Sequence, residues 1–137
     1  MTPHPLSVDK VLWIKPGQGI AASGRIPEES EFFKDHFPGF PILPGVLAIE
    51  MIKQTAECYL RAVSRLGKYH LSLKQIRGVK FSNYLKPGDE WEAHLELASE
   101  EKGQTHWNGR LLHDGKAAVT AQLILEQTLI PESIYIS

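Results

Sequence analysis

The chain has 137 residues, which indicates a single domain (residues 1–137) that can bury about 68% of its unfolded surface. Its 15 basic and 16 acidic residues give a formal net charge of −1, so neither nucleic acid nor an anionic membrane is favoured as a partner. No apolar run approaches membrane-spanning length, and the first residues lack the pattern of a signal peptide. We therefore expect a cytoplasmic protein.

The first part of the chain predicts a β-hairpin. After an irregular lead-in, residues 6–14 are rich in side chains that favour strands. Pro16 and Gly17 indicate a turn, and residues 19–26 are predicted to form the second strand.

Residues 36–45 are predicted to form a stiff loop. Its three prolines fix φ and remove backbone donors, which excludes a regular helix or a central strand. Pro44 suits the start of a helix, and Gly45 allows close approach of a ligand to the backbone. The loop should therefore hold one conformation and lead directly into a helix.

A long helix is predicted over residues 45–66. Apolar side chains recur at spacings of three and four, as expected for one continuous core-facing stripe. The first turns are apolar nearly all round, so we expect that end to be covered on every side. The stripe consists of Ile49, Ile52, Ala56, Tyr59, Val63 and Leu66.

After the helix the apolar pattern changes to a period of two, which predicts four strands in an antiparallel meander. The period slips at Gly78, where we expect a bulge or a bend. The expected strands cover residues 71–81, 91–97, 104–113 and 117–125, with turns at 87–88, 102–103 and 114–115. The core is expected to span residues 6–126, with a loosely attached tail over 127–137.

This order of elements predicts an α+β architecture. One long helix must bury its stripe against a curved antiparallel sheet of about six strands, which is the arrangement of the hotdog fold. A long edge strand invites pairing with another chain, and a helix apolar on several sides needs more cover than one sheet provides. We therefore expect a dimer.

His36 and Glu50 are candidates for acid–base chemistry. The pKa of an unperturbed histidine suits a base near neutral pH, and Glu50 lies one to two turns into an apolar helix. The free N–H groups at the start of that helix can bind negative charge. On spacing alone the ordinary alternatives stay open: such a histidine is commonly a cap or surface residue, and such a glutamate commonly pairs with Lys or Arg.

The sequence His-Phe-Pro-Gly at residues 36–39, then Pro-Ile-Leu-Pro-Gly-Val-Leu at 41–47, Glu50 and Gln54, resembles the signature of the FabZ/FabA-type dehydratases. These enzymes act on 3-hydroxyacyl chains attached to the acyl carrier protein. Residues 79–81 and 86–89 resemble later parts of the same family, so the similarity covers about residues 6–126. The resemblance implies a hotdog fold and formation of a trans-2-enoyl product. The sequence has no His-Glu-x-x-His motif and no pair of cysteines, so we expect no metal site, and we expect no cofactor.

The resemblance also implies roles for the central residues. His36 would remove the α-proton, and Glu50 would protonate the departing hydroxyl directly or through water. The N–H of Gly45 would bind the thioester oxygen, where the helix dipole favours negative charge. In the family, the histidine of one subunit works with the acid of the other.

Four further residues complete the expected substrate site. The carbonyl of Ile42 would orient the histidine, and Gln54 would hold the carboxyl group of Glu50 one helical turn away. Val46 and Phe37 are the remaining candidates for substrate binding.

Glu50 also distinguishes two branches of the family. The isomerising branch carries aspartate at this position, so we expect no isomerisation to the 3-enoyl form. Tyr84 stands where the family often has proline, which leaves the acyl chain length and the pathway open. The rival functions are a hotdog acyl thioesterase, a specialised dehydratase of a polyketide-like or polyene-like pathway, and a non-catalytic acyl-carrier partner.

The expected partners are an acidic acyl carrier protein and further copies of this chain, as a homodimer or a dimer of dimers up to a hexamer. Lys74, Arg77 and Lys80 are candidates for the carrier contact, with a solvated strand edge as the alternative. The single cysteine, Cys58, is expected to be a packing residue. His70, His94, His106 and His113 are expected to have structural or exposed roles, and His4 is expected to be structural or disordered.

Overall fold

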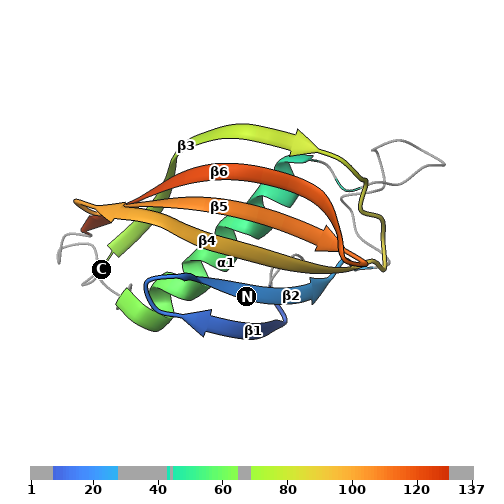
Figure 1. The fold of residues 1–137 in the computed structure, drawn as a ribbon, viewed down its shortest axis with the longest axis horizontal. Coiled ribbons are helices and arrows are strands. Elements are labelled where there is room, and N and C mark those ends of the chain that lie inside the picture. The colour runs from blue at the N-terminus through green and yellow to red at the C-terminus, as the bar shows by residue number, and fades with distance from the viewer. Residues whose placement is uncertain (1–7, 28–42, 44, 65–68, 130–137) are drawn as a thin grey trace, which may run out of the picture.

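The computed structural model describes residues 8–27, 43, 45–64 and 69–129. One six-stranded antiparallel sheet curves around a long helix, α1 (Gly45–Ser64), as Figure 1 shows. The strands are β1 (Lys10–Lys15), β2 (Gly19–Arg25), β3 (Tyr69–Phe81), β4 (Glu90–Glu101), β5 (Gln104–His113) and β6 (Lys116–Leu129). The predicted α+β hotdog architecture is confirmed.

The sheet order is β1-β2-β4-β5-β6-β3, so the predicted four-strand meander is wrong at one point. Of the four strands after α1, β4, β5 and β6 follow one another as neighbours, whereas β3 pairs with β6 at the opposite edge from β1. The connection from β3 to β4 crosses the end of the sheet, where Ser82 N–H donates to Ala118 C=O at 2.8 Å. Alternation along a strand indicates its buried face and does not indicate its neighbour, so the sequence could not reveal this crossing.

The two predicted hairpin turns after β4 and β5 are confirmed. Lys102 and Gly103 have φ of 46° and 78°, and Asp114 and Gly115 have φ of 51° and 75°. Positive φ at both central residues is the geometry that suits a two-residue hairpin loop, because its twist matches that of the strands.

The predicted irregularity in β3 is also confirmed. Gly78 has φ of 62° and lies within the register shift between Arg77 and Lys80. A second shift, between Leu73 and Gln75, carries no glycine and was not predicted from the sequence.

Several predicted boundaries change in the structure, and β4 (Glu90–Glu101) continues four residues beyond its expected end. β1 begins at Lys10, later than expected, and residues 6–7 lie outside the described part of the chain. β6 continues to Leu129, so residues 127–129 belong to the sheet instead of the tail. Helix residues 65–66 and tail residues 130–137 are outside the described residues.

The face of α1 that packs on the sheet differs in part from the predicted stripe. Ile52, Ala56 and Tyr59 are buried as expected, but Val63 is 38% exposed near the end of the helix. The buried face is completed by Ala48, Met51, Thr55 and Leu60.

Three contacts, made by two residues of α1, fix the helix on the sheet. A Cβ on Gly109 of β5 would lie 2.7 Å from Cγ2 of Ile52, so glycine permits this close approach. Tyr59 accepts a 2.7 Å hydrogen bond from Gly17 N–H at its hydroxyl, and its ring meets the edge of Trp107 at 5.1 Å between centroids. The helix is therefore held in one position and one rotation. No helix within the described ranges has the length and apolar character needed to cross a membrane.

Candidate active site

The structure places four of the predicted site residues on α1. Gly45 is the first residue of the helix and Val46 the second, while Glu50 and Gln54 follow at one-turn spacing. The remaining three, His36, Phe37 and Ile42, lie outside the described residues.

The start of α1 is fixed by the segment before it. Leu43 is only 6% exposed, and its N–H donates to Leu85 C=O at 2.7 Å in the connection between β3 and β4. The first-turn N–H groups of a helix have no partner within the helix, and the helix dipole adds positive potential there. Gly45 therefore stands where a developing oxyanion can be bound.

Phe81 is a neighbour of Gly45 to which the sequence analysis gave no role. A Cβ on Gly45 would lie 2.8 Å from Cε1 and Cζ of the Phe81 ring, so only glycine fits without moving the ring. Phe81 ends the edge strand β3 and is 55% exposed. Nothing in the local sequence indicates this contact, because it joins residues 36 positions apart through the tertiary fold.

Glu50 lies on the side of α1 that faces away from the sheet of its own chain. Successive helical residues are rotated by about 100°, so Glu50, midway between buried Ala48 and buried Ile52, points roughly to the opposite side. Gln54 follows one turn later, and Glu57 two turns later, on the same side. The candidate acid is therefore half-buried, but its own sheet does not cover it.

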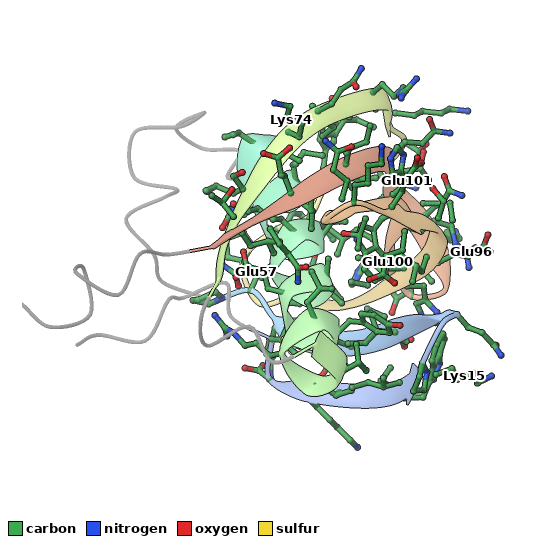
Figure 2. All side chains as sticks on the ribbon, turned by 90° about the vertical axis from the view of Figure 1, so that its left-hand side faces the viewer. Lys15, Glu57, Lys74, Glu96, Glu100 and Glu101 are labelled. Carbon is green, nitrogen blue, oxygen red and sulfur yellow. The ribbon has the colours of Figure 1, made fainter. Side chains whose placement is uncertain are left out.

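Figure 2 shows the side of α1 that faces away from the curved sheet, from which Glu57 projects. Glu57 lies between two cations, with Lys53 Nζ at 3.6 Å and Arg61 Nη2 at 3.7 Å from its carboxylate oxygens. Such i,i+4 pairs favour the helix modestly. Glu57 therefore has one ion-pair partner a turn before it and one a turn after it in the helix.

Within the single chain, the first turns of α1 are not covered on every side. Val46 is 75% exposed, because the sheet covers only one side of the helix. Apolar side chains of the neighbouring edge strand are also open, with Leu73 and Val79 each 37% exposed. Exposed apolar side chains therefore lie at the start of the helix and along the edge strand β3.

The remaining candidate groups have structural surroundings. Burial raises the pKa of the Cys58 thiol, which keeps it protonated and unreactive near neutral pH. His94 bonds to Glu92 at 2.9 Å, and His113 donates to Glu90 C=O at 2.7 Å. His4 lies outside the described residues. Within the described ranges, no group of three or more His, Cys, Asp or Glu side chains is placed to hold a metal ion.

Two hollows of about 460 and 670 Å³ lie on the outer side of the sheet, and the lining of the larger one includes Gly24 and Trp91. Both include His94, which alternates along β4 with the buried Ala93 and Leu95 and so faces the outer side of the sheet. Their linings are largely exposed polar and charged side chains. Neither hollow contributes to the candidate site.

Comparison with known proteins agrees with this geometry. The family model for ApeI-like proteins, described as ApeI dehydratase, matches residues 14–122. A curated relative from Ruminiclostridium cellulolyticum, named 3-hydroxyacyl-[acyl-carrier-protein] dehydratase FabZ, is 33% identical over 124 residues. That alignment covers 90% of this chain and 87% of the relative.

Solved structures share the fold at low sequence identity. The dehydratase heterocomplex ApeI:P from Xenorhabdus doucetiae aligns with a TM-score of 0.78 and 17% identity, covering 98% of this chain and 91% of that chain. A putative thioesterase, yhdA from Lactococcus lactis, aligns with a TM-score of 0.70 and 15% identity, covering 91% and 95%. The fold thus occurs with more than one activity, and the family is decided by the sequence matches: this chain belongs to the ApeI-like dehydratases and is a homologue of the FabZ enzymes.

Proposed function

We propose that this chain dehydrates (3R)-3-hydroxyacyl-[acyl-carrier-protein] to trans-2-enoyl-[acyl-carrier-protein], without isomerisation to the 3-enoyl form. One observation carries the proposal: a chain homologous to enzymes named for this reaction has a helix that begins at Gly45 and turns Glu50 away from its own sheet. That helix supplies an anion-binding end and a carboxyl group within two turns.

The proposed mechanism assigns one task to each group. His36 removes the weakly acidic α-proton, and the N–H of Gly45 binds the negative charge that develops on the thioester oxygen. Glu50 gives a proton to the departing hydroxyl, and Gln54 holds the Glu50 carboxyl group in place. Ile42 C=O orients the imidazole of His36.

The proposal includes a cytoplasmic homodimer, or an assembly of such dimers up to a hexamer, in which each site is shared by two subunits. Two features support the shared site. Glu50 faces away from the sheet of its own chain, and Val46 beside it is 75% exposed. A second copy that packs there would cover the apolar surface and bring its own His36 toward Glu50. Val46 and Phe37 would then contact substrate.

The decisive test is hydration of a crotonyl thioester, the reverse of dehydration, followed by loss of the ultraviolet absorbance of the conjugated enoyl group. The expected result is loss of this absorbance without release of free thiol. Thiol release without a hydratase signal would establish a thioesterase instead. A chain that does neither would be a non-catalytic partner. The pathway, whether fatty-acid synthesis or a specialised polyketide-like or polyene-like one, is then identified by the preferred acyl chain.

Gly45→Ala should lower kcat/KM about tenfold, because the new Cβ would push the Phe81 ring by its contact at 2.8 Å and shift the oxyanion site. The substitution should not weaken the helix itself, because alanine has a higher helix propensity than glycine. The double variant Gly45→Ala with Phe81→Ala removes the clash. Its activity should exceed that of Gly45→Ala alone, and equal or lower activity would show that the ring contact is not the cause.

The proposed carrier surface is the exposed edge strand β3. Lys80 is adjacent to Phe81, which contacts the start of α1, whereas Lys74 lies six residues further along, roughly 20 Å away. Lys74 is also within 4.0 Å of Glu126. Figure 2 shows Lys74 at this edge, whereas Glu96, Glu100 and Glu101, which would repel an acidic carrier, belong to β4.

Lys80→Glu should therefore raise KM for carrier-bound substrate by roughly threefold to tenfold and leave a small thioester mimic unaffected. Arg77→Glu should have a smaller effect, and Lys74→Glu serves as the matched control on the same strand. The measurement is steady-state kinetics with both substrates at two salt concentrations. Equal effects on the two substrates would mean that β3 does not contact the carrier protein.

A further inference from the structure

Trp91 carries a buried hydrogen-bond donor that the described part of the fold leaves unpaired. Its side chain is 1% exposed, and its indole Nε1 has no acceptor among the described residues. Trp107 provides a direct comparison, because it is equally buried and donates Nε1–H to Oγ1 of Thr105 at 2.8 Å. An unpaired buried donor destabilises a fold, so such a group calls for an explanation.

The position of Trp91 connects it to the candidate active site. Trp91 is the second residue of β4 and pairs in register with Gly24 near the end of β2. Figure 1 shows that β4 begins and β2 ends on the side of the molecule where α1 begins. The hydrogen bond from Leu43 to Leu85 joins the segment before α1 to the segment before β4. The indole thus lies in the core at the same end of the molecule as the start of α1.

Gly24 makes room for the indole and sets its position. A Cβ on Gly24 would lie 2.5 Å from Cζ2 and 3.1 Å from Nε1 of Trp91, so any side chain there would displace the ring. A phenylalanine or leucine at position 91 could fill apolar space without an unpaired N–H. The combination of Gly24 and Trp91 therefore places a donor where an apolar side chain would otherwise serve.

We propose that Trp91 is a specificity-determining residue whose indole N–H donates to an oxygen acceptor on the distal part of the acyl chain. This inference rests on the proposed function, with the thioester at the start of α1 and the chain extending between α1 and the sheet. The favoured substrates carry an ether, hydroxyl or carbonyl oxygen beyond the reacting carbons. A plain alkyl chain would leave the N–H unpaired, and sites built for a hydrogen bond discriminate against ligands that lack its partner.

Binding can be tested without turnover by nuclear magnetic resonance of the ¹⁵N-labelled indole groups. The probes are saturated acyl-pantetheine thioesters of several lengths, each compared with the ω-methoxy thioester of equal length. The Trp91 resonance, assigned with Trp91→Phe, should move with an ω-methoxy ligand far more than with its alkyl match, while Trp107 stays in place. Equal shifts for both ligands, or no shift of Trp91 with any ω-methoxy ligand, would overturn the inference.

Kinetics provide the second test, with 3-hydroxyacyl thioesters that carry or lack the ω-methoxy group. Wild-type protein should prefer the oxygenated substrate, and Trp91→Phe should reduce the ratio of the two kcat/KM values about tenfold, as expected for loss of one hydrogen bond. Gly24→Ala should reduce the same ratio by moving the ring. If Trp91→Phe turned over both substrates with the wild-type ratio of kcat/KM values, the inferred role of Trp91 would be wrong, while the proposed function would stand. Turnover of neither substrate by wild-type protein would overturn the proposed function, and this inference with it.

Discussion

Replacing His36 by alanine, or Glu50 by glutamine, is expected to lower kcat by about 10²–10⁴ while the protein stays folded. The alanine removes the base that takes the α-proton. The glutamine has nearly the shape of glutamate but cannot deliver a proton to the departing hydroxyl. The measurement is single-substrate kinetics on a crotonyl thioester, with circular dichroism and gel filtration to establish that fold and assembly are retained.

Glu57→Gln is the matched control for Glu50→Gln. Glu57 lies two turns further along the same side of α1, but it is held by Lys53 and Arg61. This variant should lose only weak surface ion pairs, worth at most a few tenths of a kcal/mol each. Its activity should stay close to wild type. A loss comparable to that of Glu50→Gln would mean that charge on this side of the helix matters in general, and the specific acid role of Glu50 would be wrong.

Local chemistry in the sequence was sufficient to predict the elements of the fold. Glycines after Asp114 and Lys102 favour two-residue hairpin turns, and both turns adopt the expected positive φ. The change of apolar period after α1 separated helix from strands. The neighbour of β3 could not be predicted in this way, because pairing with β6 depends on how the chain crosses the end of the sheet.

Only part of the candidate site could be predicted from the sequence. The spacing of Gly45, Glu50 and Gln54 within one helix follows from the sequence alone, since helical periodicity fixes their relative directions. The direction of Glu50 relative to the sheet does not, because it depends on which face of α1 is buried. Phe81 against Gly45 and Trp91 against Gly24 arise from contacts between distant segments. Both contacts depend on the tertiary fold, and no local pattern encodes them.

The second large expected effect is a recovery of activity, which tests the proposed sharing of each site by two subunits. If His36 of one subunit works with Glu50 of the other, a twofold dimer contains two equivalent sites, each built from both chains. Homodimers of His36→Ala and of Glu50→Gln are then both inactive. In a mixed dimer, one site combines both lesions, and the other joins an intact His36 to an intact Glu50.

Random mixing of equal amounts makes half of the dimers mixed, each with one working site of two, so about one quarter of wild-type activity should return. Subunit exchange is first demonstrated by mass spectrometry of a tagged mixture. Mixing the Glu50→Gln protein with the double variant His36→Ala, Glu50→Gln is the control, because no dimer in that mixture contains an intact Glu50. The orientation of Glu50 away from its own sheet is the structural reason to expect recovery. Exchange without recovery would mean that the two residues act within one chain, or do not act together.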